Sequence, residues 1–466
     1  MRLKKLVKLD LATATVREET KMRHDAIGAD LRLGRRAMLG AGASAIAAQA
    51  LPVRAAGAFD WQRFKGQHIE VALQRTAFAD YLKKHEKEFE ALTGITVGSE
   101  QIPEQQFRQK LVLELSSGHP SMDVCYIAYT SQKRLIGNGR WLTDLRPFLA
   151  DPSITASDFD FADFTPAAVA YATQADGRLD TIPITFHYNL LMWNKELFAA
   201  KGLAPPGSFA ALLNAARTLH DPKAGVSGFV ARGLKNANTP VWTSFLLGYG
   251  LDAIDQDGKF HTDSAEAIEA AALYQALDRD FGPIGVVGFN WYESQAEFMM
   301  GRAAMFLDTE SVGAPASDPT KSRIAAKVGY AMMPAGPKGR VAPMFGDGIG
   351  IAAASKNQGA AWLYCQWATS KTSQAWLMAG GSGAPTRGSA NDMVKTMSGR
   401  TVPDDWIAAV TASSRIARPC IPEIVAANEF RDVFGVALSN MLTGADPAEQ
   451  LHHATENFRS VYARSG

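Results

Sequence analysis

The chain contains 466 residues, of which 47% are hydrophobic, and its 48 Lys and Arg against 47 Asp and Glu residues give a formal net charge of +1 at pH 7. This balance excludes the basic footprint of a nucleic-acid-binding protein, and no segment after residue 55 is long and apolar enough to span a membrane. The length is sufficient for two hydrophobic cores, so we expect two lobes.

The first 55 residues have the features of an export signal. Arg35-Arg36 opens a twin-arginine pattern, an Ala- and Gly-rich run continues to Ala50, and small residues suit cleavage after Ala50 or Ala55. The residues before the arginine pair are many for a signal, so a translation start at Met22 is one alternative, and an internal Arg pair before an Ala-rich helix is another. A dinucleotide-binding loop in the Ala- and Gly-rich run is excluded because no strand precedes it. Removing residues 1–55, with 11 basic and 5 acidic residues, leaves 37 basic and 42 acidic residues, a net charge of about −5.

Strand and helix patterns alternate after the signal. We expect strands at 69–76, 95–97 and 123–129 and helices at 78–92 and 103–117, which is the beginning of a parallel α/β sheet. Ligands of such sheets lie at the carboxyl ends of the strands. Gln74, Arg75, Tyr126 and Tyr129 are therefore expected to line a cleft, with core or rim packing as the alternative for the two tyrosines.

The three cysteines, Cys125, Cys365 and Cys420, lack the spacing of a metal site. Cys125 and Cys365 lie in apolar runs, so we expect them to be buried. Whether a pair forms a disulfide stays open.

The segment 176–209 combines a turn, a strand-like run from Phe186 to Trp193, and a helix that begins after Asn194 and ends at Gly202. In this order it resembles the extracytoplasmic solute-binding proteins of ABC importers, in the group that binds sugars, polyols and oligosaccharides. The residues that carry the resemblance are Gly177, Leu179, Pro183, Trp193-Asn194-Lys195, Phe198, Pro205 and Pro206. The chain departs from the family pattern at Arg178, Asp180, Ser208 and Phe209.

Later segments resemble the same family in the same order. They are a helix and strand at 293–308 around Gly301 and Arg302, a Pro-Gly crossing at 328–339, a strand at 346–351, a helix at 360–368, and the Pro-Thr-Arg segment at 384–387. The resemblance implies an α/β, two-lobed periplasmic binding protein fold with a hinge and an interlobe ligand cleft. We expect the first lobe at 59–166 and 342–392, and the second at 167–341 and 393–466.

A sugar or polyol needs carboxylates, amides and arginine for its hydroxyls, and aromatic rings for its C–H faces. Side chains of these types near strand ends and in polar loops are the predicted ligand-binding residues: Gln74, Arg75, Tyr126, Tyr129, His187, Tyr188, Asn238, Trp242, Trp291, Tyr292, Asp308, Glu310, Asp347 and Arg387. Packing between the lobes is the alternative for both tryptophans, and a salt bridge across the lobes is the alternative for Arg387. Asp308 and Glu310 are alternatively solvated surface carboxylates, and His187 is alternatively a packing histidine.

The resemblance implies a periplasmic protein that captures a carbohydrate and delivers it to a membrane permease. We expect a monomer without a cofactor or a metal. A neutral mono- or disaccharide or a polyol is the expected ligand. Glycerol 3-phosphate is the alternative, which the lack of an obvious basic cluster disfavours.

An exported carbohydrate-active enzyme is a second class of function. Acid pairs exist, such as Asp308 with Glu310, but nothing marks them as acid and base. His85-Glu86 lacks the second histidine of a zinc-protease motif, no Gly-x-Ser-x-Gly elbow occurs, and His452-His453 suits a helix surface. We therefore expect binding without turnover.

Overall fold

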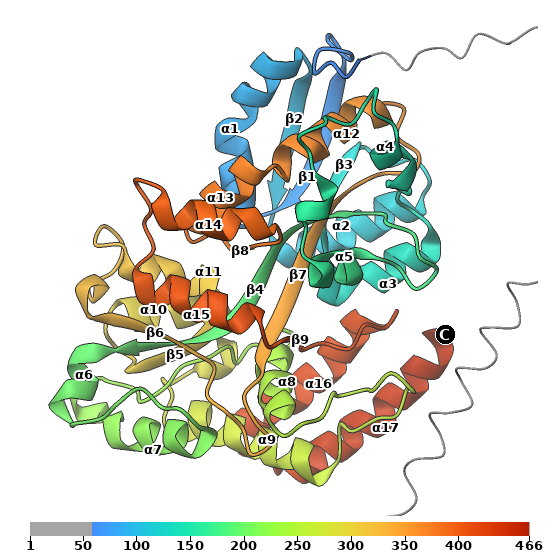
Figure 1. Ribbon diagram of the computed structural model, residues 1–466. Helices are drawn as coiled ribbons and strands as arrows, with labels where there is room; N and C mark the ends of the chain where they lie inside the picture. The colour runs from blue at the N-terminus through green and yellow to red at the C-terminus, as the bar shows by residue number, and fades with distance from the viewer. Residues whose placement is uncertain (1–57, 466) are drawn as a thin grey trace, which may run out of the picture. The chain divides into compact units, whose positions relative to one another are not determined.

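The computed structural model describes residues 58–465 (Figure 1). The predicted export signal lies outside the described residues, together with Met22, Arg35-Arg36 and both cleavage positions. Among the described residues, every helix is too short or too polar to cross a membrane.

The chain begins with the expected parallel α/β unit. Strand β1 (His68–Gln74) pairs in parallel with β2 (Thr96–Ile102) and with β3 (Val124–Ala128). Helices α1 (Ala77–Thr93) and α2 (Glu104–Ser116) connect these strands. The first strand ends two residues earlier than predicted because the Thr76 side chain accepts a hydrogen bond from Ala79 N and caps α1, which Gly94 ends in the left-handed conformation (φ 68°).

Two long strands join the parts of the nine-stranded sheet. Strand β4 (Ile182–Asn194) pairs with β7 (Ala342–Ile351) over its first half, and with β5 (Met305–Thr309) and β6 (Val328–Met332) over its second half. Strand β7 pairs with β3 at its end and with β9 (Ala417–Pro419) at its start. Figure 1 shows β4 and β7 running side by side from the unit of β1–β3 to that of β5 and β6.

Helices cover both parts of the sheet. Near β1–β3 lie α3 (Tyr129–Gly139), α4 (Arg146–Ala150), α5 (Pro166–Ala172), α12 (Gln358–Ala368), α13 (Lys371–Ala379) and α14 (Gly388–Thr396), with the short strand β8 (Ala384–Pro385). Near β5 and β6 lie α6 (Lys195–Ala200), α7 (Phe209–Leu219), α10 (Trp291–Met299), α11 (Glu310–Gly313) and α15 (Asp404–Ser414). A further group, α8 (Thr239–Gly248), α9 (Ala265–Gln275), α16 (Ala427–Leu442) and α17 (Pro447–Ser465), packs together, and α8 contacts β7. The lobe boundaries stay a prediction.

One predicted boundary shifts in a way that affects the site. Helix α10 begins at Trp291 rather than at Glu293, because Asn290 and Glu293 form a capping box. The following strand, β5, begins at Met305 and includes Asp308. Trp291 and Tyr292 therefore lie in the first turn of a helix, and Asp308 lies within a strand. The three cysteines are free and buried, as predicted for Cys125 and Cys365.

Candidate functional site

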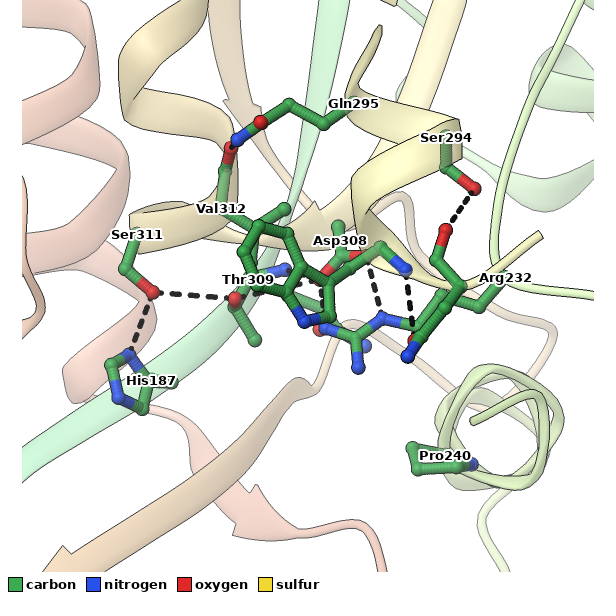
Figure 2. Close-up of polar contacts among 12 residues, drawn as sticks. His187, Arg232, Pro240, Ser294, Gln295, Asp308, Thr309, Ser311 and Val312 are labelled. Atoms are coloured by element: carbon green, nitrogen blue, oxygen red, sulfur yellow. Dashed lines mark hydrogen bonds and ion pairs between the residues drawn. The ribbon is translucent and has the colours of Figure 1, made fainter. Parts of the chain in front are cut away.

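Two carboxylates from different segments meet at His187 on β4. Its Nδ1 lies 3.0 Å from Oε1 of Glu310, the first residue of α11, and its Nε2 lies 3.1 Å from Oδ2 of Asp347 on β7. Because Thr185 is the partner of Asp347 in the β4–β7 ladder, the side chains of His187 and Asp347 are diagonal neighbours on one face of the sheet. Ser311 Oγ also lies 3.0 Å from His187 Nδ1 (Figure 2).

The two carboxylates keep His187 charged. Burial lowers the pKa of His187, but Glu310 and Asp347 outweigh burial and raise it to about 10. The imidazolium therefore donates from both nitrogens at neutral pH. Glu310 is fully buried, and its second oxygen accepts from the Tyr188 backbone N at 2.6 Å.

A second ion pair joins Arg232 to Asp308 on β5. Arg232 Nε donates to Asp308 Oδ2 at 2.7 Å and its terminal nitrogen donates to Oδ1 at 2.5 Å, which is the bidentate geometry shown in Figure 2. Burial lowers the pKa of Arg232, but Asp308 outweighs burial and raises it above its ordinary value. Arg232 was not among the predicted residues.

A third set of charges consists of Glu104, at the start of α2, and the arginines around it. Arg108 donates to Glu104 one helical turn away. Burial raises the pKa of Glu104, but Arg108, Arg431 on α16 and Arg232 outweigh burial and hold it below its ordinary value. Burial and then the like charge of Arg108 lower the pKa of Arg431 to about 9, so Arg431 stays protonated at neutral pH.

Sequence reasoning missed these three arginines. Arg108 and Arg431 lie on helix faces whose other members are apolar, such as Phe107 with Leu111 and Phe430 with Phe434. A single arginine on an apolar face was the available signal, because a buried guanidinium requires partners.

Several predicted residues lie among these charges. Burial raises the pKa of Tyr126 well above its ordinary value, and the charges that act on its hydroxyl include those of Asp347, Glu104 and Arg108. Burial raises the pKa of Tyr292, while the nearby charge of Arg75 lowers it and that of Glu104 raises it. The rings of Trp291 and Tyr292 stack with their centroids 3.4 Å apart, and Tyr292 is 46% exposed.

Gln74 is the last residue of β1, the strand that pairs with β3, which carries Tyr126. Its side-chain oxygen is buried and has no hydrogen-bond partner among residues 58–465.

Four predicted residues are held elsewhere by contacts within the protein, and we leave them out of the proposed site. Tyr129 bonds to Thr181 Oγ1 at 2.9 Å, and Trp242 stacks on Phe434 and donates to Ala267 O at 3.1 Å. The Asn238 amide donates to two backbone carbonyls at 3.0 and 3.1 Å. Arg387 donates to Thr369 O at 2.7 Å and lies 3.9 Å from the ring centre of Phe164. Each of these side chains is buried and engaged by these internal contacts, so we propose a structural role for each.

The clustered carboxylates and histidine do not form a metal site. Over residues 58–465, no group of three or more His, Cys, Asp or Glu side chains has the arrangement needed to hold an ion. The arrangement instead offers paired hydrogen-bond donors and acceptors beside two aromatic rings, which suits a small polyhydroxy ligand.

Comparison with known proteins gives matches over most of the chain. The family model described as bacterial extracellular solute-binding protein matches residues 74–375. The erythritol/L-threitol-binding protein of Mycolicibacterium smegmatis is 29% identical over 402 residues, which are 78% of this chain and 83% of that protein. The mannitol-binding protein of Pseudomonas aeruginosa is 24% identical over 281 residues, 58% of this chain and 61% of that protein.

Solved structures are similar over nearly the whole described region. A solute-binding protein from Agrobacterium radiobacter K84 in complex with ribitol is 24% identical, with a TM-score of 0.78 over 85% of this chain and 99% of that one. A solute-binding protein from Agrobacterium vitis S4 with bound D-mannitol is 22% identical, with a TM-score of 0.73 over 86% of this chain and 99% of that one. These likenesses confirm the predicted fold, an α/β fold with two lobes.

Proposed function

The chain belongs to the family of bacterial extracellular solute-binding proteins, and we propose from this premise that it captures a polyol or a related carbohydrate for an ABC importer. Relatives named for binding erythritol and mannitol, and similar structures that hold ribitol and mannitol, support this ligand class. The protein would deliver its ligand to a membrane permease. Export by the twin-arginine signal, location in the periplasm and a monomeric state belong to the same proposal.

The charge balance of the site is the observation that carries the ligand class. Apart from the exposed Arg75, four cationic side chains and four carboxylates lie together: Arg108, Arg232, Arg431 and His187 with Glu104, Asp308, Glu310 and Asp347. A buried charge is stable only with a partner, so a charged ligand would leave an unmatched charge in this cluster. A neutral polyol fits because its hydroxyls donate to carboxylates and accept from guanidinium and imidazolium groups.

This balance also weighs against glycerol 3-phosphate. A basic cluster of Arg108, Arg232 and Arg431 does exist, contrary to our expectation from the sequence. Each arginine, however, lies near a carboxylate, and Asp308 engages Arg232 through both oxygens. A phosphate would have to displace these carboxylates, which argues for the neutral ligand.

The proposed ligand-binding residues come from both predicted lobes. Gln74, Arg75 and Tyr126 come from the first lobe, and Asp308, Trp291 and Tyr292 come from the second. His187, Glu310 and Asp347 lie where β4 and β7 join the two, with Tyr188 positioning Glu310. A ligand held by both sides would stabilise a closed arrangement of the lobes.

We propose binding without turnover. Asp308 is engaged by Arg232, and Glu310 and Asp347 are both engaged by His187. A general acid and base need carboxyl groups that exchange protons during a reaction, whereas these carboxylates are paired with cations that stay protonated at neutral pH.

A thermal-shift screen tests the proposal. The exported protein is mixed with erythritol, ribitol, D-mannitol, maltose and glycerol 3-phosphate, and the ligands are analysed afterwards by mass spectrometry. At 100 times its dissociation constant, a ligand should add about 2.7 kcal/mol of stability. We expect a shift with a neutral polyol, which is recovered unchanged. A shift with glycerol 3-phosphate alone, or conversion of the ligand, would overturn the proposal.

A further inference from the structure

We propose that Ser131 and Gln132, at the start of α3, contact the ligand directly and, with Arg108, bind neighbouring hydroxyl groups of a polyol. None of these three residues was singled out by the sequence. The inference rests on the proposed function and adds a set of hydrogen bonds that selects ligands with adjacent hydroxyls.

Unpartnered buried polar atoms carry the inference. Ser131 Oγ, Gln132 Nε2 and Arg108 Nε have no hydrogen-bond partner among the described residues. The three side chains are 2%, 1% and 9% exposed. Burying a polar group without a partner costs about 1–3 kcal/mol each, so three such atoms together imply a partner that the protein itself does not supply.

Gln132 lies beside the charged cluster. Its side-chain oxygen accepts from Ala128 N at 3.3 Å, and Ala128 is the ladder partner of Asp347 across β3 and β7. Asp347 in turn binds His187. The free amide nitrogen of Gln132 is thus fixed next to the end of β3, where the carboxylates of the site begin.

Ser131 and Arg108 lie on two helices, α3 and α2, that adjoin the same cluster. The Ser131 carbonyl accepts from Asn428 Nδ2 at 3.2 Å, so the start of α3 lies against the start of α16, which also carries Arg431. Helix α2 packs against α3, and the charge of its Arg108 acts on both Tyr126 and Arg431. The helices that carry the three atoms therefore adjoin the charged groups of the proposed site.

The chemistry of these atoms selects the ligand. Arg108 Nε and Gln132 Nε2 are donors only, and Ser131 Oγ both donates and accepts. Two adjacent hydroxyls can accept from these donors while donating to Asp347 or Glu310. An apolar solute or a lone hydroxyl would leave at least one of the three atoms unpaired.

Ser131→Ala tests the inference because it deletes an unpartnered hydroxyl and keeps the carbonyl that binds Asn428. In the free protein, this change should leave the melting temperature unchanged or raise it, since no internal hydrogen bond is lost. Titration calorimetry with ribitol, erythritol and D-mannitol should show a dissociation constant raised about tenfold for the polyol that the wild type binds. Gln132→Glu, which keeps an oxygen for Ala128 N and removes the free amide, should weaken binding at least as much.

Ser413→Ala is the matched control. Ser413 Oγ on α15 is also buried without a partner, yet α15 packs on β6 and β4. This variant should bind like the wild type. Wild-type affinity of Ser131→Ala and Gln132→Glu would overturn the inference and leave the proposed function standing, whereas a wild type that binds none of the polyols would overturn both.

Discussion

His187 Nε2 lies 3.1 Å from Oδ2 of Asp347, and the two residues belong to the two strands, β4 and β7, that join both parts of the sheet. A charged contact at this junction connects the ligand site to the segments about which two lobes would move. Because Glu310 holds the other nitrogen of His187, the imidazolium links three segments at once.

The charge on His187 should make stability fall at alkaline pH. Its pKa in the folded protein is about 10, against about 6.5 for an unperturbed histidine. The resulting stabilisation is fully present below about pH 6.5 and is lost as the pH rises through the folded value. The free energy of unfolding, measured by urea titration from pH 7 to pH 10, should therefore decrease with pH.

His187→Gln isolates this effect from other groups that titrate near pH 10. The variant should be less stable than the wild type at pH 7, and the difference should shrink towards pH 10. A difference that stays constant across this range would show that the imidazole is neutral in the folded protein.

Breaking the Arg232–Asp308 pair should be costly on either side. Asp308 is 3% exposed and engages Arg232 through both oxygens. Arg232→Met or Asp308→Asn leaves a buried group without its partner, so each should lower the free energy of unfolding by about 3–5 kcal/mol. Urea unfolding measures this.

The exposed pair Arg146–Asp144 gives the comparison, since Arg146→Met should cost at most about 1 kcal/mol. Equal costs at the two positions would contradict the burial of the first pair.

The exposed ring of Tyr292 should contribute to ligand affinity. It stacks on Trp291 and presents a face next to Arg75 and Glu104. Tyr292→Ala should raise the dissociation constant for a polyol by about tenfold with little loss of stability, because contacts between aromatic rings and C–H faces are worth about 1 kcal/mol. Trp376→Ala removes an equally exposed ring, 45% against 46%, from α13. Affinity that responds equally to both changes would rule out a specific contact.

The three thiols should be unreactive until the protein unfolds. Burial raises the pKa of Cys125 and Cys365 well above the ordinary value, and that of Cys420 to about 12. Only the thiolate reacts, so Ellman's reagent should detect no thiol in the native protein and three after denaturation without a reductant. Two fewer thiols in the denatured protein would reveal a disulfide.

The alternation of strands and helices was predictable because hydrophobic periodicity is strong from β1 to β3. The sequence also pointed to His187, Glu310 and Asp347, since each follows or ends an apolar run. At Asn238 and Trp242 it left ligand binding and packing both open, and we propose packing. Every residue of the following helix, Thr239–Gly248, is buried, so its nearly continuous apolar composition indicated a core element rather than a cleft.

Long-range pairing explains the rest of what sequence reasoning missed. Arg108 and Arg431 are more than three hundred positions apart, and their proximity depends on α2 and α16 both lying near Glu104. Arg387 was predicted to bind the ligand, and we leave it out of the proposed site because it lies over Phe164, a cation–π contact between distant segments that no local pattern reveals.

Titration calorimetry of the exported protein with ribitol, erythritol, D-mannitol and glycerol 3-phosphate tests the charge-balanced site most directly. We predict that one neutral polyol binds with a dissociation constant in the micromolar range or below, about −8 kcal/mol or stronger, and that glycerol 3-phosphate does not bind. Tight binding of glycerol 3-phosphate without binding of any neutral polyol would contradict the account, because it would require a site with an excess of positive charge.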